Sequence, residues 1–288
     1  MRTAAIVGAG PIGCSVGLAL RRHGVATHVI DADPEAARRA EERGAGVAEA
    51  PAQPADIAVI AVPPGQVAPV LAEHQKLGTA RVYTEVSAVK VRLYHEAWAH
   101  GCDLTSLVGG HPVVGEGGSW PREPREDLFE GRPWALSPTD ATDILALNRA
   151  LELVALCGAV SVLLDPETHD RAAALVSHAP YLIASLAAAR LLDGDESAVR
   201  LAGQDLRAVT RIADGNPDLW TDTLTANAGP VADQLDGWAA QAGLLARELR
   251  DVARSGDPAR PERLRAILRS GAAGRARIPG PWDNTPLD

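Results

Sequence analysis

Short apolar runs alternate with helix-like segments through the first half of the chain. The runs are rich in Val, Ile, Thr and Ala, and we expect them as β-strands at residues 3–7, 26–30, 56–62, 81–86, 107–109, 134–137 and 160–164. Between them, helical spacing predicts helices at 14–23, 34–43, 67–78 and, capped by Thr139 or Asp140, up to about 157. The run at 56–62 is continuously apolar, which is typical of a strand buried on both faces of a parallel sheet. This pattern predicts an α/β domain.

The pattern changes at Asp165-Pro166, where an acidic cap followed by proline predicts the start of a helix. Beyond it, alanine- and leucine-rich segments predict helices at 168–192, 198–213, 217–227, 230–254 and 261–270. We therefore expect an α/β domain over residues 1–165 and an all-α domain over residues 166–288. Apolar faces on a small helical domain commonly pack against a second copy, which predicts a homodimer. Residues 272–288 are proline-rich and lack periodicity, so we expect an extended arm there.

A glycine-rich turn joins the first expected strand to the first expected helix. In Gly8-Ala9-Gly10-Pro11-Ile12-Gly13, the first glycine allows the tight turn, the second lets the backbone approach a pyrophosphate, and the third lets helix and strand pack closely. An acidic residue, Asp31, ends the next strand, where a carboxylate binds the ribose hydroxyls and repels a 2′-phosphate. The sequence thus predicts a Rossmann-type domain that binds NAD rather than NADP. Its expected cofactor-binding residues are Gly8, Gly10, Pro11, Ile12, Gly13, Asp31, Val62 and Pro63.

Composition narrows the class of protein. A net charge of -9 argues against nucleic acid as a partner, because nucleic acid favours basic surfaces. The three cysteines are scattered without metal-ligand spacing, so we expect no metal site and a reducing compartment. No signal peptide is evident at the start, and no apolar run approaches the roughly 20 residues needed to cross a bilayer. We expect a cytoplasmic protein without a membrane partner.

Two loops at the carboxyl edge of the expected sheet carry candidate chemistry. A double glycine precedes His111, and Pro112 restricts the backbone of that histidine to an extended shape. Ser87-Ala88-Val89-Lys90 follows the fourth strand, at the edge where open α/β sheets bind ligands. Lys90 on its own is most simply explained as a solvated surface charge. The loop from 116 to 131 is rich in glycine, proline and charge, which predicts a mobile flap.

Polar residues also interrupt the apolar helices of the second half. Pro180 is expected to kink its helix and thereby aim His178, although a hydrogen-bonded core histidine explains the same spacing. His169-Asp170, at the start of that helix, is expected to be a capping pair rather than part of a site. Arg211 lies in an apolar helical context, so we expect it to be paired either with a substrate carboxylate or with an internal acid.

Five motifs occur in an order typical of one enzyme family: GAGPIG, VSAVK, GGHPVVG, HDRAAALVSHAPY and VTRIADGNPDLW. This ordered set resembles the prephenate/arogenate dehydrogenase family. The resemblance implies a Rossmann-type domain, an all-α dimerisation domain and a site between them. It also implies NAD-dependent oxidation of a small cyclohexadienyl carboxylate with loss of carbon dioxide, on the route to tyrosine.

The resemblance also implies roles for individual residues. His111 takes the proton of the ring 4-hydroxyl while hydride leaves that carbon, His178 and Arg211 line the site, and Trp220 supports its wall. Three positions depart from the family pattern. Ala88 occupies the position of a family serine that bonds to the catalytic histidine, so that either Ser87 replaces this serine or His111 lacks its usual partner. Tyr181 replaces a histidine, and Glu116 is placed to meet the amino group of arogenate or to disfavour prephenate.

These departures leave alternatives open. The substrate can be prephenate, arogenate or a relative from specialised metabolism such as 4-amino-4-deoxyprephenate, in which an amine replaces the ring hydroxyl. A nucleotide-binding protein that has lost the chemistry is a further possibility. The β-hydroxyacid dehydrogenases share the predicted layout, but they need a catalytic lysine in the second domain, and no lysine follows Lys90.

Overall fold

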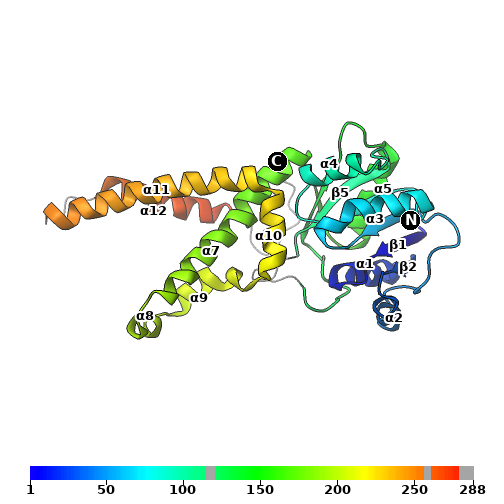
Figure 1. Ribbon diagram of the computed structural model, residues 1–288, viewed down its shortest axis with the longest axis horizontal. Coiled ribbons are helices and arrows are strands. Elements are labelled where there is room, and N and C mark those ends of the chain that lie inside the picture. Colours follow the sequence, from blue (N-terminus) through cyan, green and yellow to red (C-terminus); the bar gives the residue numbers. More distant parts are fainter. Residues whose placement is uncertain (115–120, 256–260, 279–288) are drawn as a thin grey trace. The chain divides into compact units, whose positions relative to one another are not determined.

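The computed structural model describes residues 1–114, 121–255 and 261–278 (Figure 1). Its internal contacts divide the chain into two compact units, Met1–Ala228 and Gly229–Asp288. The first unit contains the whole sheet and the helices up to residue 226, so contacts do not thin out at the expected boundary near 165. The reason is that the helices after that point pack on the sheet domain, with α6 (Pro166–Ala173) against α4 (Val91–Ala99) and against β6 (Pro133–Ser137).

A single sheet forms the centre of the first unit, as the alternating pattern predicts. Its strands are β1 (Thr3–Val7), β2 (Ala26–Ile30), β3 (Ile57–Ile60), β4 (Tyr83–Glu85), β5 (Leu107–Pro112), β6 (Pro133–Ser137) and β7 (Val160–Leu163). The strands lie in the order β2-β1-β3-β4-β5-β6-β7, and all neighbours are parallel except β5 and β6. The predicted α/β architecture followed by helices is confirmed.

Helices cover both faces of this sheet and enclose two apolar cores. One core joins β1 and β3 to α1 (Pro11–Arg22) and α5 (Ile144–Leu156), and the other joins the opposite faces of these strands to α3 (Val67–Leu77) and α4. A short helix α2 (Pro34–Glu42) follows β2. All four residues of β3 are buried, as its continuous apolar run predicts.

The structure of this unit differs from the sequence predictions in four details. The helix α4 was not predicted, and α5 begins at Ile144 with Asp143 as its cap rather than Thr139 or Asp140. Strand β5 continues through His111 and Pro112, because it pairs with β6 over this stretch. The loop predicted as a flap is anchored in its described part from 121 to 131, where Leu128 and Phe129 belong to the core at 2% and 0% exposure.

The helices after residue 165 are more broken than their sequence pattern predicts. The expected helix over 168–192 divides into α6, a π-helical turn (Ala174–His178), α7 (Ala179–Ala189) and a 3₁₀ turn (Arg190–Leu192). The π turn lies directly before Pro180, where the missing amide was expected to disturb the helix. The expected helix over 198–213 divides into α8 (Glu196–Arg200), α9 (Gln204–Thr210) and a 3₁₀ turn, η4 (Arg211–Asp214). The next helix is α10 (Pro217–Ala226).

Two helices make up the described part of the second unit. Helix α11 (Ala228–Ser255) begins at the last residue of the first unit, and α12 (Glu262–Ala276) follows. The Glu248 carboxylate of α11 accepts hydrogen bonds from the backbone amides of Arg263 and Leu264, which lie in the first turn of α12. The arm expected from residue 272 is therefore helical to Ala276, and its part from 279 lies outside the described residues.

One helical stretch of the described chain, Pro166–Leu192, is long and apolar enough to span a bilayer by length and composition alone. This stretch differs from the expectation that no apolar run approaches the length needed to cross a bilayer. A third of its most apolar window (33%) is buried inside the structure. Core helices meet the same criteria, so the stretch is weak evidence for a membrane span.

The most unusual feature of the fold is a charged pair in its interior. Lys90 and Glu85 form an ion pair with both side chains at 0% exposure, which overturns the prediction that Lys90 is a solvated surface charge. The Lys90 ammonium also donates to the carbonyl oxygen of Gly110 at 2.6 Å, and Glu85 accepts from the Gly110 amide at 2.9 Å. Because buried charges are costly unless paired and hydrogen-bonded, each partner depends on the other.

We predict that Lys90→Met lowers the free energy of unfolding by about 3–5 kcal/mol, because Glu85 would remain as an uncompensated buried charge. Urea denaturation followed by circular dichroism measures this loss. The other lysine, Lys76, is exposed, and Lys76→Met serves as the matched control with an expected change within about 0.5 kcal/mol. Equal stability of the two variants would contradict the assigned role of the buried pair.

Candidate active site

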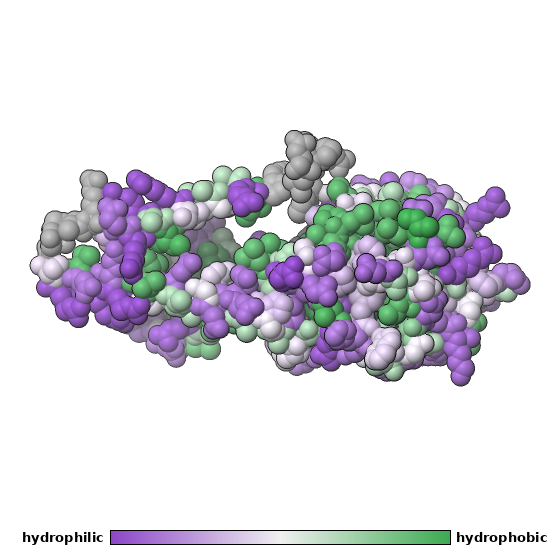
Figure 2. Space-filling view, turned by 90° about the horizontal axis from the view of Figure 1, so that it is seen from above, coloured by the Kyte–Doolittle hydropathy of each residue, from purple (hydrophilic) through white to green (hydrophobic). Residues whose placement is uncertain are grey.

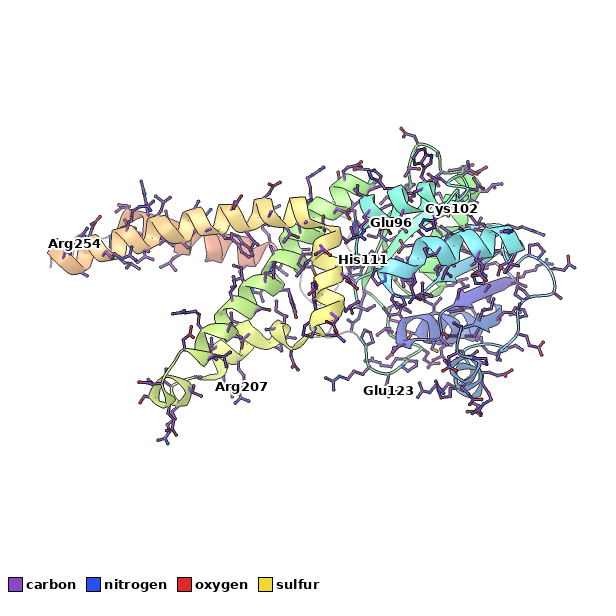
Figure 3. All side chains as sticks on the ribbon, in the orientation of Figure 1. Glu96, Cys102, His111, Glu123, Arg207 and Arg254 are labelled. Atoms are coloured by element: carbon purple, nitrogen blue, oxygen red, sulfur yellow. The ribbon has the colours of Figure 1, made fainter. Side chains whose placement is uncertain are left out.

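The site begins at the backbone of Gly110, which the Lys90–Glu85 pair holds from both sides. A Cβ atom at Gly110 would lie 2.4 Å from the carbonyl oxygen of Glu85, so this position in β5 has room only for glycine. The next residue is His111, at the carboxyl edge of the sheet, which Figure 3 labels. The rigid histidine expected from Gly-Gly-His-Pro is therefore held by a buried ion pair in addition to its glycines and proline.

The His111 side chain is hydrogen-bonded to a second histidine. Its Nδ1 lies 2.9 Å from Nε2 of His169, and Nδ1 of His169 lies 2.8 Å from the Asp170 carboxylate. His169 and Asp170 are 3% and 2% exposed. The same carboxylate accepts the backbone amides of Lys90 at 2.8 Å and Val91 at 2.9 Å. His169 and Asp170 are thus part of the site, and their prediction as a capping pair was wrong; Asp165 caps the helix instead.

Burial lowers the pKa of His111 well below the usual 6.5 of an imidazole, and the neighbouring His169 and Lys90 lower it further. The ring is therefore neutral at physiological pH. A neutral imidazole has one nitrogen that can accept a proton, which is the property that a general base requires.

A third histidine, His178, lies in the π turn and is 1% exposed. Its Nδ1 lies 3.0 Å from the side-chain amide of Asn227, which also donates to the Asp170 carbonyl oxygen at 2.8 Å. Burial lowers the pKa of His178 to about 4. Since the amide donates to Nδ1, the proton of the neutral ring lies on Nε2, and this N–H has no partner within the described chain. It is a buried donor available to a ligand.

An aromatic pair adjoins His178. Tyr181 of α7 stacks on Trp220 of α10 with ring centroids 3.8 Å apart and planes within 10°. The edge of His178 meets Trp220 at a centroid distance of 6.3 Å. The indole N–H of Trp220 is buried and, among the residues that the structure describes, it too lacks a partner. The predicted supporting tryptophan therefore brings a second unsatisfied donor to the same cluster.

Arg211 lies in η4, which packs against α7. Its side chain is exposed and has no hydrogen-bond or ion-pair partner in the described structure. The expectation of a buried arginine paired with an internal acid was therefore wrong, because the 3₁₀ turn presents this residue at the surface. A guanidinium without a protein partner remains free to bind a carboxylate.

The Ser87 side chain is directed to the buried ion pair. Its hydroxyl and its amide both bond to Glu85, and the hydroxyl lies 3.4 Å from the Lys90 ammonium. Within the described structure, Ser87 makes no hydrogen bond to His111. The side chain that bonds to His111 is that of His169.

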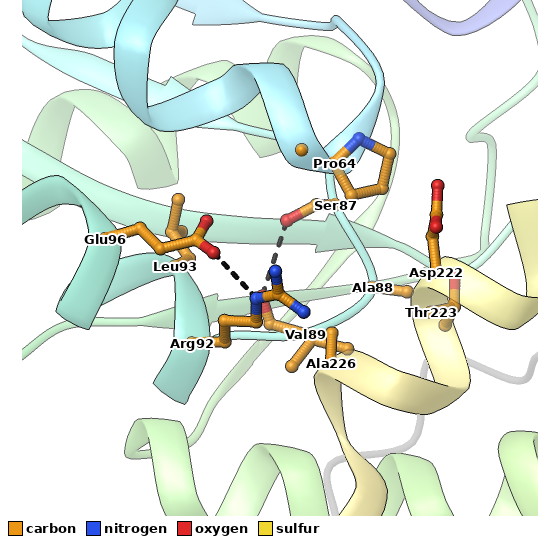
Figure 4. Close-up of a pocket in the computed structure, with 11 residues that line it drawn as sticks. Pro64, Ser87, Ala88, Val89, Arg92, Leu93, Glu96, Asp222, Thr223 and Ala226 are labelled. Carbon is orange, nitrogen blue, oxygen red and sulfur yellow. Dashed lines mark hydrogen bonds and ion pairs between the residues drawn. The ribbon is translucent and has the colours of Figure 1, made fainter.

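A cavity of about 120 Å³ adjoins the Ser87 loop (Figure 4). The Ser87 loop and α4 form one side of the cavity, and α10 forms the other. The residues that line it include Ser87, Ala88, Val89, Arg92, Glu96, Asp222, Thr223 and Ala226. The Arg92 guanidinium already donates to Glu96 at 2.7 Å. Ala88, the residue that departs from the expected serine pattern, thus lines this cavity.

The glycine turn forms a second part of the site at the same edge of the sheet. Gly8 has φ +109°, and a Cβ at Gly13 would lie 2.0 Å from the Gly8 carbonyl oxygen, so both positions require glycine. A Cβ at Gly10 would meet nothing within 4 Å, which leaves open space at the start of α1. Asp31 accepts the amide of Ala9 at 2.7 Å.

This geometry fits a dinucleotide. The open backbone at Gly10 and the start of α1, with Pro11 and Ile12, suit a pyrophosphate, and the Asp31 carboxylate suits a ribose. Val62 and Pro63 follow β3 at the same edge, at the strand-order switch beside β1 where open α/β sheets bind ligands.

Hydrogen bonds and ring contacts join His111, Ser87, His178 and Trp220 into one network. In the described structure, no hydrogen bond or ring contact links Arg211 or the glycine turn to this network. Glu116 lies outside the described residues. Sequence reasoning missed Lys90, His169, Asp170 and Asn227. Their signals were weak but present: Lys90 follows a strand directly at the ligand-binding edge, and His169-Asp170 stands in the same motif as His178.

Comparisons with known proteins agree with this description. The family "Prephenate dehydrogenase, nucleotide-binding domain" matches residues 16–163, and "Prephenate dehydrogenase, dimerization domain" matches residues 165–269. A curated relative from Streptomyces niveus, "Probable prephenate dehydrogenase NovF", is 49% identical over 283 residues, which are 97% of this chain and 78% of the relative.

Solved structures show the same fold. The A. aeolicus prephenate dehydrogenase, in complex with hydroxyphenyl propionate and NAD+, superposes with a TM-score of 0.82 at 23% identity and covers 97% of this chain and 99% of its own. The Synechocystis arogenate dehydrogenase has a TM-score of 0.77 at 25% identity and covers 96% of this chain and 100% of its own. With both family domains matched in order and a relative that is 49% identical, the chain belongs to the prephenate dehydrogenase family.

Proposed function

We propose that the protein is an NAD-dependent dehydrogenase that oxidises and decarboxylates prephenate or arogenate to 4-hydroxyphenylpyruvate or tyrosine. The observation that carries this proposal is the neutral, rigidly held His111 at the ligand-binding edge of the sheet, together with the two buried N–H groups of His178 and Trp220, which have no partner among the described residues. A base and two donors suit a substrate that loses a hydroxyl proton and carries carboxylate groups.

The proposed oxidation needs one proton acceptor from the protein, and His111 fills this role. His111 takes the proton of the ring 4-hydroxyl as the hydrogen on the same carbon leaves with its electron pair, so that a carbonyl forms. When bound, NAD accepts this hydride. The bond between the opposite ring carbon and its carboxylate then breaks, carbon dioxide leaves, and the electron pair restores aromaticity and generates the phenol oxygen, which takes up a proton. Loss of carbon dioxide makes the reaction irreversible.

The remaining residues bind and orient the substrate. The Nε2–H of His178 and the indole N–H of Trp220 are placed to donate to carboxylate or carbonyl oxygens of the substrate. Arg211, exposed and without a described partner, is the candidate cationic anchor for a carboxylate. Glu116 is the candidate partner for the amino group that distinguishes arogenate from prephenate.

The specificity for NAD rests on Asp31. Asp31 directly follows β2 beside the glycine turn, where its carboxylate would bond to ribose hydroxyls and repel the 2′-phosphate of NADP. The match to a nucleotide-binding domain and the NAD complex of the A. aeolicus protein support this assignment.

A second candidate substrate is 4-amino-4-deoxyprephenate. The observation that favours it is the loss of a hydroxyl near His111: Ala88 occupies the family serine position, and the Ser87 hydroxyl is taken up by Glu85. A substrate with an amine in place of the ring hydroxyl has different hydrogen-bonding needs at the ring position that faces His111.

We also propose that the protein acts as a homodimer. The match to a dimerization domain supports this, and the helices of that region expose large apolar side chains in the isolated chain. Within the part of that region that belongs to the first unit, Val176 is 73% exposed, Leu186 59%, Leu192 88% and Val209 60%. On the face that Figure 2 presents, hydrophobic residues lie among hydrophilic ones over the helices, and they are most continuous over the half of the picture that holds the sheet. Burying such side chains against a second copy removes apolar surface from water.

We predict that purified protein reduces NAD with prephenate or arogenate, at a rate at least about tenfold above that with NADP, which corresponds to about 1.4 kcal/mol of discrimination by Asp31. The measurement is NADH absorbance in a side-by-side assay of prephenate, arogenate and 4-amino-4-deoxyprephenate with each cofactor. Turnover of the amino compound alone would replace the first candidate by the second. NAD binding without turnover of any of the three would identify an inactive relative.

We predict that His111→Asn lowers kcat by about 10²–10⁴-fold, the usual contribution of a general base, while NAD affinity is unchanged. Because the pKa of His111 is lowered, kcat/KM of the wild type should stay constant down to pH 6.5 and fall only at lower pH, as the ring becomes protonated. Stopped-flow assays across pH measure both effects. A fall in rate that begins above pH 7 would show that another group is the base.

We predict that Leu186→Glu shifts the protein from dimer towards monomer, because a charge would have to be buried in the interface. Sedimentation velocity at micromolar concentration measures the shift. Leu145→Glu, at a side chain that is 70% exposed on α5 of the nucleotide-binding domain, is the control and should leave the dimer intact. A monomeric wild type would refute the proposed dimer.

A further inference from the structure

A hydrogen-bonded chain of three side chains leads from His111 into the interior. It runs from Nδ1 of His111 to Nε2 of His169 over 2.9 Å, and from Nδ1 of His169 to Oδ1 of Asp170 over 2.8 Å. The rings of His111 and His169 meet edge to face with centroids 5.1 Å apart. His169 and Asp170 are nearly inaccessible to solvent.

The position of each proton in this hydrogen-bonded chain follows from the Asp170 carboxylate at its inner end. A carboxylate only accepts hydrogen bonds, and both Asp170 oxygens already accept backbone amides, from Lys90 and Val91. The carboxylate therefore requires the proton of neutral His169 to lie on Nδ1. The Nε2 of His169 is then an acceptor, and it requires the proton of His111 to lie on Nδ1. As a result the Nε2 of His111 carries a free lone pair.

We propose that His169 and Asp170 are positioning residues that hold His111 as the tautomer whose Nε2 accepts the substrate proton. The inference rests on the proposed function for the identity of that proton, but the tautomer itself is a property of the free protein. The opposite tautomer would place the lone pair of His169 against the carboxylate and would leave His111 with an N–H facing the substrate.

The same arrangement stabilises the charge that forms during the reaction. Once His111 has taken a proton, its Nδ1–H still donates to His169, and the negative Asp170 lies one ring away. The nearby charged and titratable groups are Lys90, which is paired with Glu85, and His178, whose Nδ1 is bonded to Asn227. Neither offers His111 an acceptor, and Ser87 bonds to Glu85. His169 therefore holds the orienting role left open by Ala88.

Paired substitutions of His169 test this role. Glutamine can donate to Asp170 through its NH₂ group and accept from His111 through its oxygen, whereas phenylalanine can do neither. We expect His169→Phe to lower kcat by about 10²–10³-fold with KM changed less than about threefold, and His169→Gln to retain at least about a tenth of wild-type kcat. His74→Phe removes a buried histidine bonded to Thr79 outside the site, and this control should keep wild-type kcat.

A second measurement does not depend on activity. Long-range ¹H–¹⁵N correlation spectra of the imidazole rings report which nitrogen carries the proton in the full-length protein. We expect His111 to be protonated on Nδ1 in the wild type and in His169→Gln, and to populate both tautomers in His169→Phe. A wild-type His111 protonated on Nε2, or equal kcat in the wild type and His169→Phe, would overturn the inference. If no cyclohexadienyl substrate is oxidised, the proposed function fails, and the spectra still decide the tautomer.

Discussion

The buried contact between Lys90 and Glu85 is the constraint on which the site depends. The pair takes both hydrogen-bonding groups of Gly110 and so fixes the residue that precedes His111. Glu85 ends β4 and Lys90 precedes α4, so the pair also closes the turn between them. Removing two charges from water costs free energy of desolvation. Strand β5 pairs with β4 only at Leu107 and Val108, so the backbone N–H and C=O of Gly110 bond to the two charged side chains and not to β4.

A functional site arises where this sheet edge meets the helix that starts at Pro166. The edge contributes His111, and the helix contributes His169, Asp170 and His178. Residues 169 and 178 are nine positions apart, which in a regular α-helix at 100° per residue places them on opposite faces. The π turn over Ala174–His178 changes this register. Both side chains thereby join one hydrogen-bonded network through Asp170 and Asn227.

The sequence predicts the architecture well because its signals are local and periodic. Strand runs, the glycine turn and the Asp165-Pro166 helix start each depend on neighbouring residues, and the structure has them close to their expected bounds. Lys90 was misjudged because its partner, Glu85, lies on a different element and burial depends on the whole fold. His169-Asp170 was misjudged because a histidine and an aspartate near a helix start fit a cap equally well. Arg211 was placed in the interior because spacing alone does not reveal the 3₁₀ turn.

The carboxylate of Asp170 links the edge of the sheet to the helix that starts at Pro166. One of its oxygens is shared by the Lys90 amide and the His169 ring, so the sheet edge and the helix cannot separate at this point without releasing the imidazole. One carboxylate thus sets both the packing of this helix on the sheet and the orientation of the imidazole, so that neither can change without the other.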